Sequence, residues 1–125
     1  NNFTKRAFTI DEAALGPNHP AVAIDLNNLA ELYRTQKKYD EAEPLYQQAL
    51  HINELALGAE HPHVALALNN LALLHKAQEK YAEAKTLYQR ALVIYERALG
   101  LEHPNTRQVR GNYEELLNKM RSEKP

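Results

Sequence analysis

The strongest constraint on the fold of this chain is a five-residue segment, LNNLA, that occurs twice at a fixed spacing. The copies at 26–30 and 68–72 are 42 residues apart, and a degenerate copy follows at 110–114 after the same interval. Two other landmarks keep this period. A Leu-Gly pair ends at positions 16, 58 and 100, and a His-Pro pair begins at positions 19, 61 and 103. An internal repeat of this length is typical of a solenoid, in which each unit packs only on its neighbours.

Hydrophobic periodicity and residues typical of helix ends divide the chain into six helices. Apolar residues recur at helical spacing, each glycine of the Leu-Gly pairs ends a helix, and each proline of the His-Pro pairs begins one. The expected fold class is therefore all-α, a right-handed α-α superhelix of antiparallel helices forming a single array over residues 1–125. Its expected parts are the second helix of a truncated repeat at 2–15, helix pairs at 20–57 and 62–99, and a C-terminal capping helix at 104–121.

Three local expectations accompany this division. Asp40, with Glu43 three residues later, resembles a capping box at the start of a helix. Pro44 is expected to fall in the first turn of that helix, where proline is tolerated. Arg110 and Glu114 replace the leucine and alanine of LNNLA in the last copy. Charge at these positions predicts that no helix packs against them, as a capping repeat requires.

The order of small and large residues within each helix pair resembles the tetratricopeptide repeat. The residues that carry the resemblance in the first pair are Leu26, Leu29, Ala30 and Tyr33, then Ala42, Tyr46 and Ala49. The period of 42, the LNNLA segment and the His-Pro loop are similar to the kinesin light chain type of this repeat, over residues 3–120. The resemblance implies a scaffold whose first helices line a concave groove that binds a peptide or a partner protein.

The asparagine pairs are the leading candidates for ligand contact. Asparagine inside a helix costs roughly 0.6 kcal/mol relative to alanine, so its recurrence needs a reason. Its amide can pair with both polar groups of an extended peptide backbone. The resemblance implies that the second asparagine of each pair, Asn28, Asn70 and Asn112, contacts the peptide. The alternative is that the amides tie neighbouring helices together, and this reading is favoured for Asn27 and Asn69.

Four further positions are candidates at the edge of the groove. Arg34 and Lys76 are equivalent in the repeat and suit a ligand carboxylate, although a solvated helix end explains them equally well. Glu31 and Leu73 are also equivalent, so the chemistry of the groove differs between repeats. Leu73 would form apolar pockets together with two further side chains, those of Ile24 and Leu66.

Other classes of function find little support in the sequence. No catalytic motif or phosphate-binding loop is present, so we expect neither an enzyme nor a cofactor. His19, His61 and His103 recur with the loop and lie a full repeat apart, which disfavours a metal site. A net charge of −1 argues against nucleic acid, and no apolar run is long enough for a membrane span.

The ends of the chain suggest an alternative role and a larger context. Phe3, Phe8 and Ile10 lie on a first helix without a pairing partner, so self-association into a homo-oligomer through the end helices is the rival function. The chain begins at Asn1 without a signal-peptide pattern or an initiator methionine, which suggests a segment of a longer protein. The lack of cysteine favours a reducing, cytoplasmic location.

Overall fold

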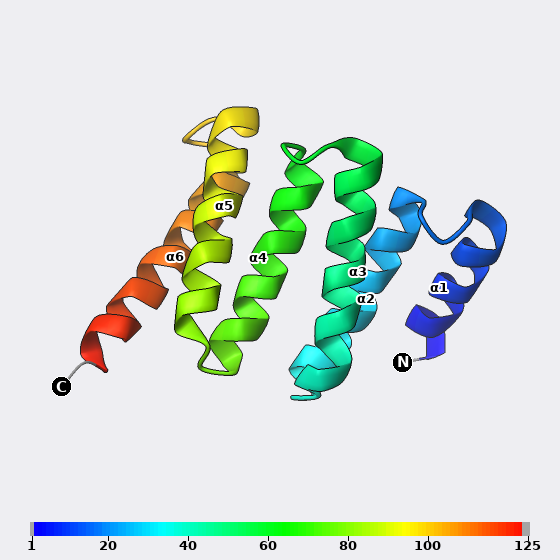
Figure 1. Ribbon diagram of the computed structural model, residues 1–125, viewed down its shortest axis with the longest axis horizontal. Helices are drawn as coiled ribbons and strands as arrows, with labels where there is room; N and C mark the ends of the chain where they lie inside the picture. The colour runs from blue at the N-terminus through cyan, green and yellow to red at the C-terminus, as the bar shows by residue number, and fades with distance from the viewer. Residues whose placement is uncertain (1, 124–125) are drawn as a thin grey trace. The chain divides into compact units, whose positions relative to one another are not determined.

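A computed structural model describes residues 2–123 and confirms the expected all-α class (Figure 1). This part of the chain contains six α-helices: α1 (Asn2–Leu15), α2 (Pro20–Thr35), α3 (Tyr39–Leu57), α4 (Pro62–Ala77), α5 (Tyr81–Leu99) and α6 (Pro104–Ser122). They form two compact units that divide after Ala59. The first unit contains α1, α2 and α3, and the second contains α4, α5 and α6.

Each His-Pro pair builds the start of a helix. Pro20, Pro62 and Pro104 are the first helical residues, and the histidine before each proline is the N-cap. In all three caps the Nδ1 atom of the histidine accepts a hydrogen bond from the backbone N–H two residues later, at 3.0, 3.0 and 3.1 Å. This bond satisfies one of the free N–H groups at the helix start. The histidines therefore recur because they cap helices, a role that the sequence analysis did not foresee.

The turn inside each helix pair is a Schellman motif without glycine. Lys37 has a positive φ of 62°, its N–H donates to the carbonyl of Arg34 at 3.0 Å, and the N–H of Lys38 donates to the carbonyl of Tyr33 at 2.9 Å. Glu79 has the same φ in the second unit, with the equivalent two bonds. Glycine is the usual residue in this left-handed position, because side chains disfavour it. The predicted glycine stops do have positive φ, at Gly58 and Gly100 among others.

Two expectations about α3 are wrong. The helix begins at Tyr39, and its N-cap is Lys38, whose side chain makes no capping bond, so Asp40 and Glu43 do not form a capping box. Asp40 is instead the second helical residue, where its charge favours the helix dipole. Pro44 lies inside the helix and not in its first turn. It has no N–H to donate to the carbonyl four residues earlier, so α3 lacks one bond of its ladder there.

The core of the first unit is built by α2 and α3. Small residues, Ala23 and Ala49, let the two helices approach closely, and larger apolar side chains fill the remaining space. The buried cluster consists of Val22, Ala23, Leu26, Ala49 and Ile52, with Phe8 of α1 and Leu45 of α3 packed against it.

The second unit repeats this arrangement and adds α6. Tyr88 of α5 is fully buried, and its ring lies 6.5 Å from that of Tyr113 on α6. The Tyr113 hydroxyl also accepts a hydrogen bond from the side chain of Gln89 at 2.9 Å. Val109 and Leu116 of α6 are buried. These contacts place α6 against α5 and leave one face of α6 next to α4.

Candidate functional site

The two asparagines of each pair have different environments. The first members, Asn27 and Asn69, are buried, with 9% and 7% of their surface exposed. The second members are more accessible, since Asn28 is exposed and Asn70 is half-buried. Successive residues of a helix are turned by about 100° from each other, so one amide of each pair faces the core while the other reaches solvent. The second asparagines therefore meet the accessibility that a ligand contact requires.

In the second unit an amide–amide hydrogen bond joins α4 to α6. The Nδ2 atom of Asn112 donates to the Oδ1 atom of Asn69 at 3.3 Å. At this pair the asparagine amides thus tie two neighbouring helices together, which is the alternative role considered for the asparagines. The bond also fixes the amide of Asn112, which remains half-buried and not fully enclosed.

Lys76 forms an ion pair with Glu115, an acidic residue that was not among the candidates from the sequence. The Nζ atom of Lys76 on α4 lies 2.7 Å from an Oε1 oxygen of Glu115 on α6. This hydrogen bond, together with the positive charge of Lys76, lowers the pKa of Glu115. The 42-residue spacing could have revealed the pair, since Glu115 occupies the repeat position of Glu31 and Leu73. A ligand carboxylate at Lys76 would have to compete with Glu115.

Arg34, the equivalent of Lys76 in the first unit, has different partners. Its Nε atom donates to the Tyr46 hydroxyl at 3.4 Å, and its guanidinium lies 4.0 Å from the carboxylate of Glu31. Burial raises the pKa of Tyr46, and the hydrogen bond from Arg34 partly opposes this effect. Glu31 is exposed, so the Arg34–Glu31 pair is open to solvent. Leu73 is half-buried, while Ile24 and Leu66 are exposed.

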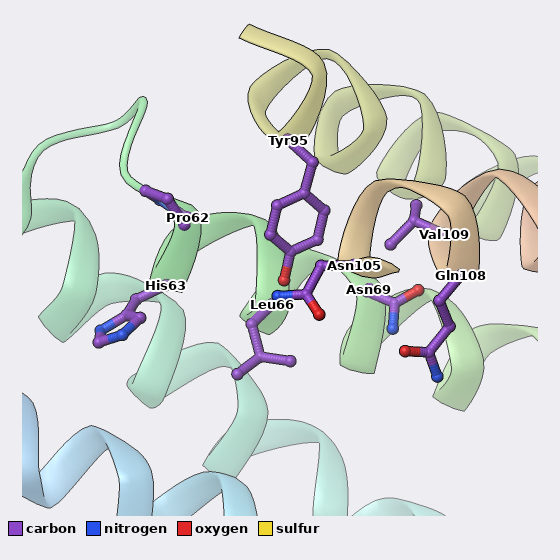
Figure 2. Close-up of a pocket in the computed structure, with 8 residues that line it drawn as sticks. All are labelled: Pro62, His63, Leu66, Asn69, Tyr95, Asn105, Gln108 and Val109. Atoms are coloured by element: carbon purple, nitrogen blue, oxygen red, sulfur yellow. The ribbon is translucent and has the colours of Figure 1, made fainter. Parts of the chain in front are cut away.

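A pocket of about 240 Å³ lies within the second unit, between the first turns of α4 and α6 (Figure 2). Figure 2 shows the Tyr95 side chain extending from α5 toward the α4 and α6 residues of the pocket. The lining residues are Pro62, His63, Leu66, Asn69, Tyr95, Asn105, Gln108 and Val109. We call this space the α4–α6 pocket. It brings together Leu66 and Asn69, two residues that the sequence analysis singled out.

The α4–α6 pocket has both polar and apolar groups in its lining but no acidic residue, lysine or arginine. Tyr95 is 3% exposed, and burial raises the pKa of its hydroxyl. Sequence reasoning missed Tyr95, Asn105 and Gln108. For Gln108 a signal existed, because the repeat aligns it with Ile24 and Leu66. Tyr95 had no such signal, since Asn53 and Asp11 occupy its position in the other repeats.

The first unit contains a pair of carboxyl groups, one buried and one half-buried, that the sequence analysis also missed. Asp25 of α2 is buried and interacts with Asp11 of α1. Burial, followed by the hydrogen bond and the negative charge of Asp11, raises the pKa of Asp25 to about 6. Two carboxyl groups can share a hydrogen bond only when one of them is protonated. The contact between α1 and α2 is therefore sensitive to pH.

Within residues 2–123, no three histidine, cysteine, aspartate or glutamate side chains are grouped so that they could hold a metal ion. None of the helices described here combines the length and the apolar character that crossing a membrane demands.

Comparison with known families assigns residues 4–123 to one repeat family. The family model for the tetratricopeptide repeat matches residues 4–55, 26–97 and 63–123. Among curated proteins, nephrocystin-3 of Xenopus laevis is 49% identical over 45 residues, which are 36% of this chain and 4% of that protein. Human nephrocystin-3 has the same identity over 45 residues, 3% of its length. The chain thus spans a small part of these relatives.

Solved structures extend the likeness to nearly the entire chain. BtubC (BKLC) from P. vanneervenii has a TM-score of 0.84 and 26% identity, covering 94% of this chain and 47% of its own. A kinesin light chain-like protein of Podosopora anserina, with nearly identical TPR-like repeats, has a TM-score of 0.82 and 23% identity, covering 92% of this chain and 55% of its own. The chain spans about half the length of these solved chains, and the second likeness concerns the fold alone.

Proposed function

Because this chain belongs to the tetratricopeptide repeat family, and its structural neighbours are kinesin light chain-like repeat proteins, we propose that it binds an extended peptide of a partner protein. The peptide would lie along the accessible face of α4 and α6 in the second unit. The first unit presents the equivalent residues on α2 as a separate surface of the same kind. The family supports the broader role, a scaffold for protein–protein interaction. The peptide and its path on the surface are the proposal.

The observation that carries the proposal is the accessibility of Asn28 and Asn70. Both lie inside helices, where asparagine is unfavourable, and Asn28 is exposed while Asn70 is half-buried. A side-chain amide can accept from the N–H and donate to the C=O of one peptide unit. Amides that recur once per repeat suit recognition of the backbone, which every extended peptide offers.

The neighbouring polar contacts give the other candidates supporting roles. The hydrogen bond between Asn69 and Asn112 holds the amide of Asn112 in place before a ligand arrives. Fixing a binding group in advance lowers the entropy that binding must offset. The Lys76–Glu115 pair restrains the same two helices at a second position. Arg34 and Glu31 offer one charge of each sign to a ligand of the first unit.

Selection from a random peptide display library would test the proposal. The wild-type chain and an Asn28→Ala/Asn70→Ala double variant would be screened in parallel, with circular dichroism confirming that both are folded. A Gln47→Ala/Gln48→Ala double variant is the matched control, because it removes two exposed amides from α3. We expect peptides that bind the wild type and the control but not the asparagine variant. Equal enrichment on all three proteins would refute a binding role for these asparagines.

Self-association is the second candidate, and the exposed residues of α1 favour it. Phe3 and Ile10 are 80% and 64% exposed, whereas Phe8 packs against the core of the first unit. Light scattering at high protein concentration decides this point. A dimer that a Phe3→Ser/Ile10→Ser variant abolishes would support self-association, and a monomeric wild type would exclude it.

A further inference from the structure

The α4–α6 pocket carries an inference about the side chain that it accepts. We propose that it binds an uncharged carboxamide, the side chain of glutamine or asparagine, from the peptide whose binding is proposed above. This inference rests on that proposed function for its biological meaning. Its physical basis is the set of polar groups in the pocket, its charge and its size.

Two polar groups of largely buried residues line the pocket without being sealed from solvent. The first is the hydroxyl of Tyr95, a residue that is almost fully buried. The second is the Nδ2 atom of Asn69, whose Oδ1 atom already accepts from Asn112. A ligand that fills the pocket buries both groups, and burying a polar group without a hydrogen-bond partner is unfavourable. The pocket therefore favours a ligand with two polar atoms that can bond to both groups.

The charge of the pocket selects an uncharged ligand. Its lining contains no carboxylate, ammonium or guanidinium group, and the imidazole of His63, which also lines it, belongs to an exposed residue. A charged side chain entering it would lose water without gaining a counterion, which is unfavourable. Burial, which raises the pKa of Tyr95, keeps the hydroxyl in its neutral form, so it can donate as well as accept.

Size and donor pattern narrow the choice to a carboxamide. A volume of about 240 Å³ is below the range of roughly 300–1,000 Å³ that is usual for small-molecule sites, and it suits one side chain. A carboxamide oxygen can accept from Nδ2 of Asn69, and its NH₂ group can donate to the Tyr95 hydroxyl. The methylene groups of the ligand would contact Leu66 and Val109, which also line the pocket. An apolar side chain of equal size would leave both polar groups unpaired.

Small capped amino acids provide a direct test with the complete chain. The probes are N-acetyl methylamides of glutamine, glutamate and leucine, followed by ¹H–¹⁵N NMR of the side-chain amides of Asn69, Asn105 and Gln108. Tyr95→Phe removes only the hydroxyl. Tyr88→Phe is the matched control, a buried tyrosine of the same helix that does not line the pocket. Circular dichroism would verify the fold of both variants.

We expect the glutamine probe to give saturable shifts of the three amides. The glutamate and leucine probes should bind at least about tenfold more weakly, because glutamate would lose the water around its charge and leucine has no polar atom to pair with the two groups. Tyr95→Phe should lower the affinity for the glutamine probe roughly three- to tenfold, which corresponds to the loss of one neutral hydrogen bond. Tyr88→Phe should leave this affinity unchanged. Absence of shifts, equal binding of the three probes, or indifference to Tyr95→Phe would each overturn the inference.

The peptide-binding proposal and the carboxamide-pocket proposal can be refuted independently of each other. If peptides selected by the display library depend on Asn70 but do not enrich glutamine or asparagine, peptide binding stands and the carboxamide pocket is refuted. If the glutamine probe binds as described and no peptide is selected, the pocket stands and the proposed peptide function fails.

Discussion

At three helix starts a histidine is the N-cap residue, a role that serine, threonine, aspartate or asparagine usually fills. His19, His61 and His103 each accept a backbone hydrogen bond through Nδ1, and each precedes a proline that begins the helix. The bond requires an unprotonated Nδ1, so the proton of the neutral ring lies on Nε2. The recurrence of this residue thus has a backbone explanation that involves neither metal nor catalysis.

Removing one of these caps should lower stability by a predictable amount. His61→Ala should reduce the free energy of unfolding by about 1 kcal/mol, the usual cost of losing an N-cap. His61→Asn should restore most of the loss, because the asparagine oxygen can accept the same bond. Urea denaturation of the three proteins measures the difference. An asparagine variant as unstable as the alanine variant would show that the ring acts through packing and not through the bond.

At the scale of single elements, α1 differs from the other second helices. At the position where α3 has Asn53 and α5 has Tyr95, α1 has Asp11, which interacts with the buried Asp25 of α2. The same repeat position therefore carries a pocket tyrosine in the second unit and half of a carboxyl pair in the first. The interaction between Asp11 and Asp25 therefore favours a protonated carboxyl group, while Phe8 of α1 also packs against the core of the first unit.

This proton should make the stability of the chain depend on pH. The pKa of Asp25 is about 6 in the folded chain, above the value of roughly 3.9 in an unfolded chain. Folding therefore favours the protonated form, and stability should fall as the pH rises from about 4 to about 6. Asp25→Asn should raise the free energy of unfolding at pH 7 by on the order of 1–3 kcal/mol. The gain should vanish near pH 4.

Urea denaturation of the wild type and Asp25→Asn between pH 4 and pH 7 would measure this effect. Glu114→Gln is a suitable control, because Glu114 is an exposed carboxylate in the middle of α6 and away from both helix ends. A difference between wild type and Asp25→Asn that stays constant over this pH range would contradict the explanation.

At the scale of the whole molecule, each unit has its own buried core, as expected for a repeat protein whose stability is the sum of local terms. Leu26→Ala, in the core of the first unit, should cost about 2–5 kcal/mol locally. Native-state hydrogen exchange should then show faster exchange in α2 and α3 than in α4 and α5. Equal acceleration throughout residues 2–123 would show that the chain unfolds as one cooperative body.

Much of this architecture follows from residues whose effect is local and repeated. Glycine at the ends of α3 and α5 and proline at the starts of α2, α4 and α6 predict helix limits because each acts on its own backbone. The prediction of a capping box is wrong because Lys38, and not Asp40, is the residue with non-helical backbone that precedes α3. Glu115 and Tyr95 escaped prediction because their roles depend on partners from other helices. The asparagines were recognisable by their cost in a helix, whereas the bond between Asn69 and Asn112 required the packing of α4 on α6.

The capped loops have a consequence for how such a chain can change its length. The segments that follow Gly58 and Gly100 share a positive-φ glycine, a short linker, a histidine cap and a proline start. If a second copy of residues 58–99 were inserted after Leu99, both new junctions would again join a leucine to a glycine. The inserted helices would begin and end at the same glycine, histidine and proline residues as the original ones. Recombination can therefore add or remove whole repeats in such a chain, because the residues at each junction between repeats stay the same.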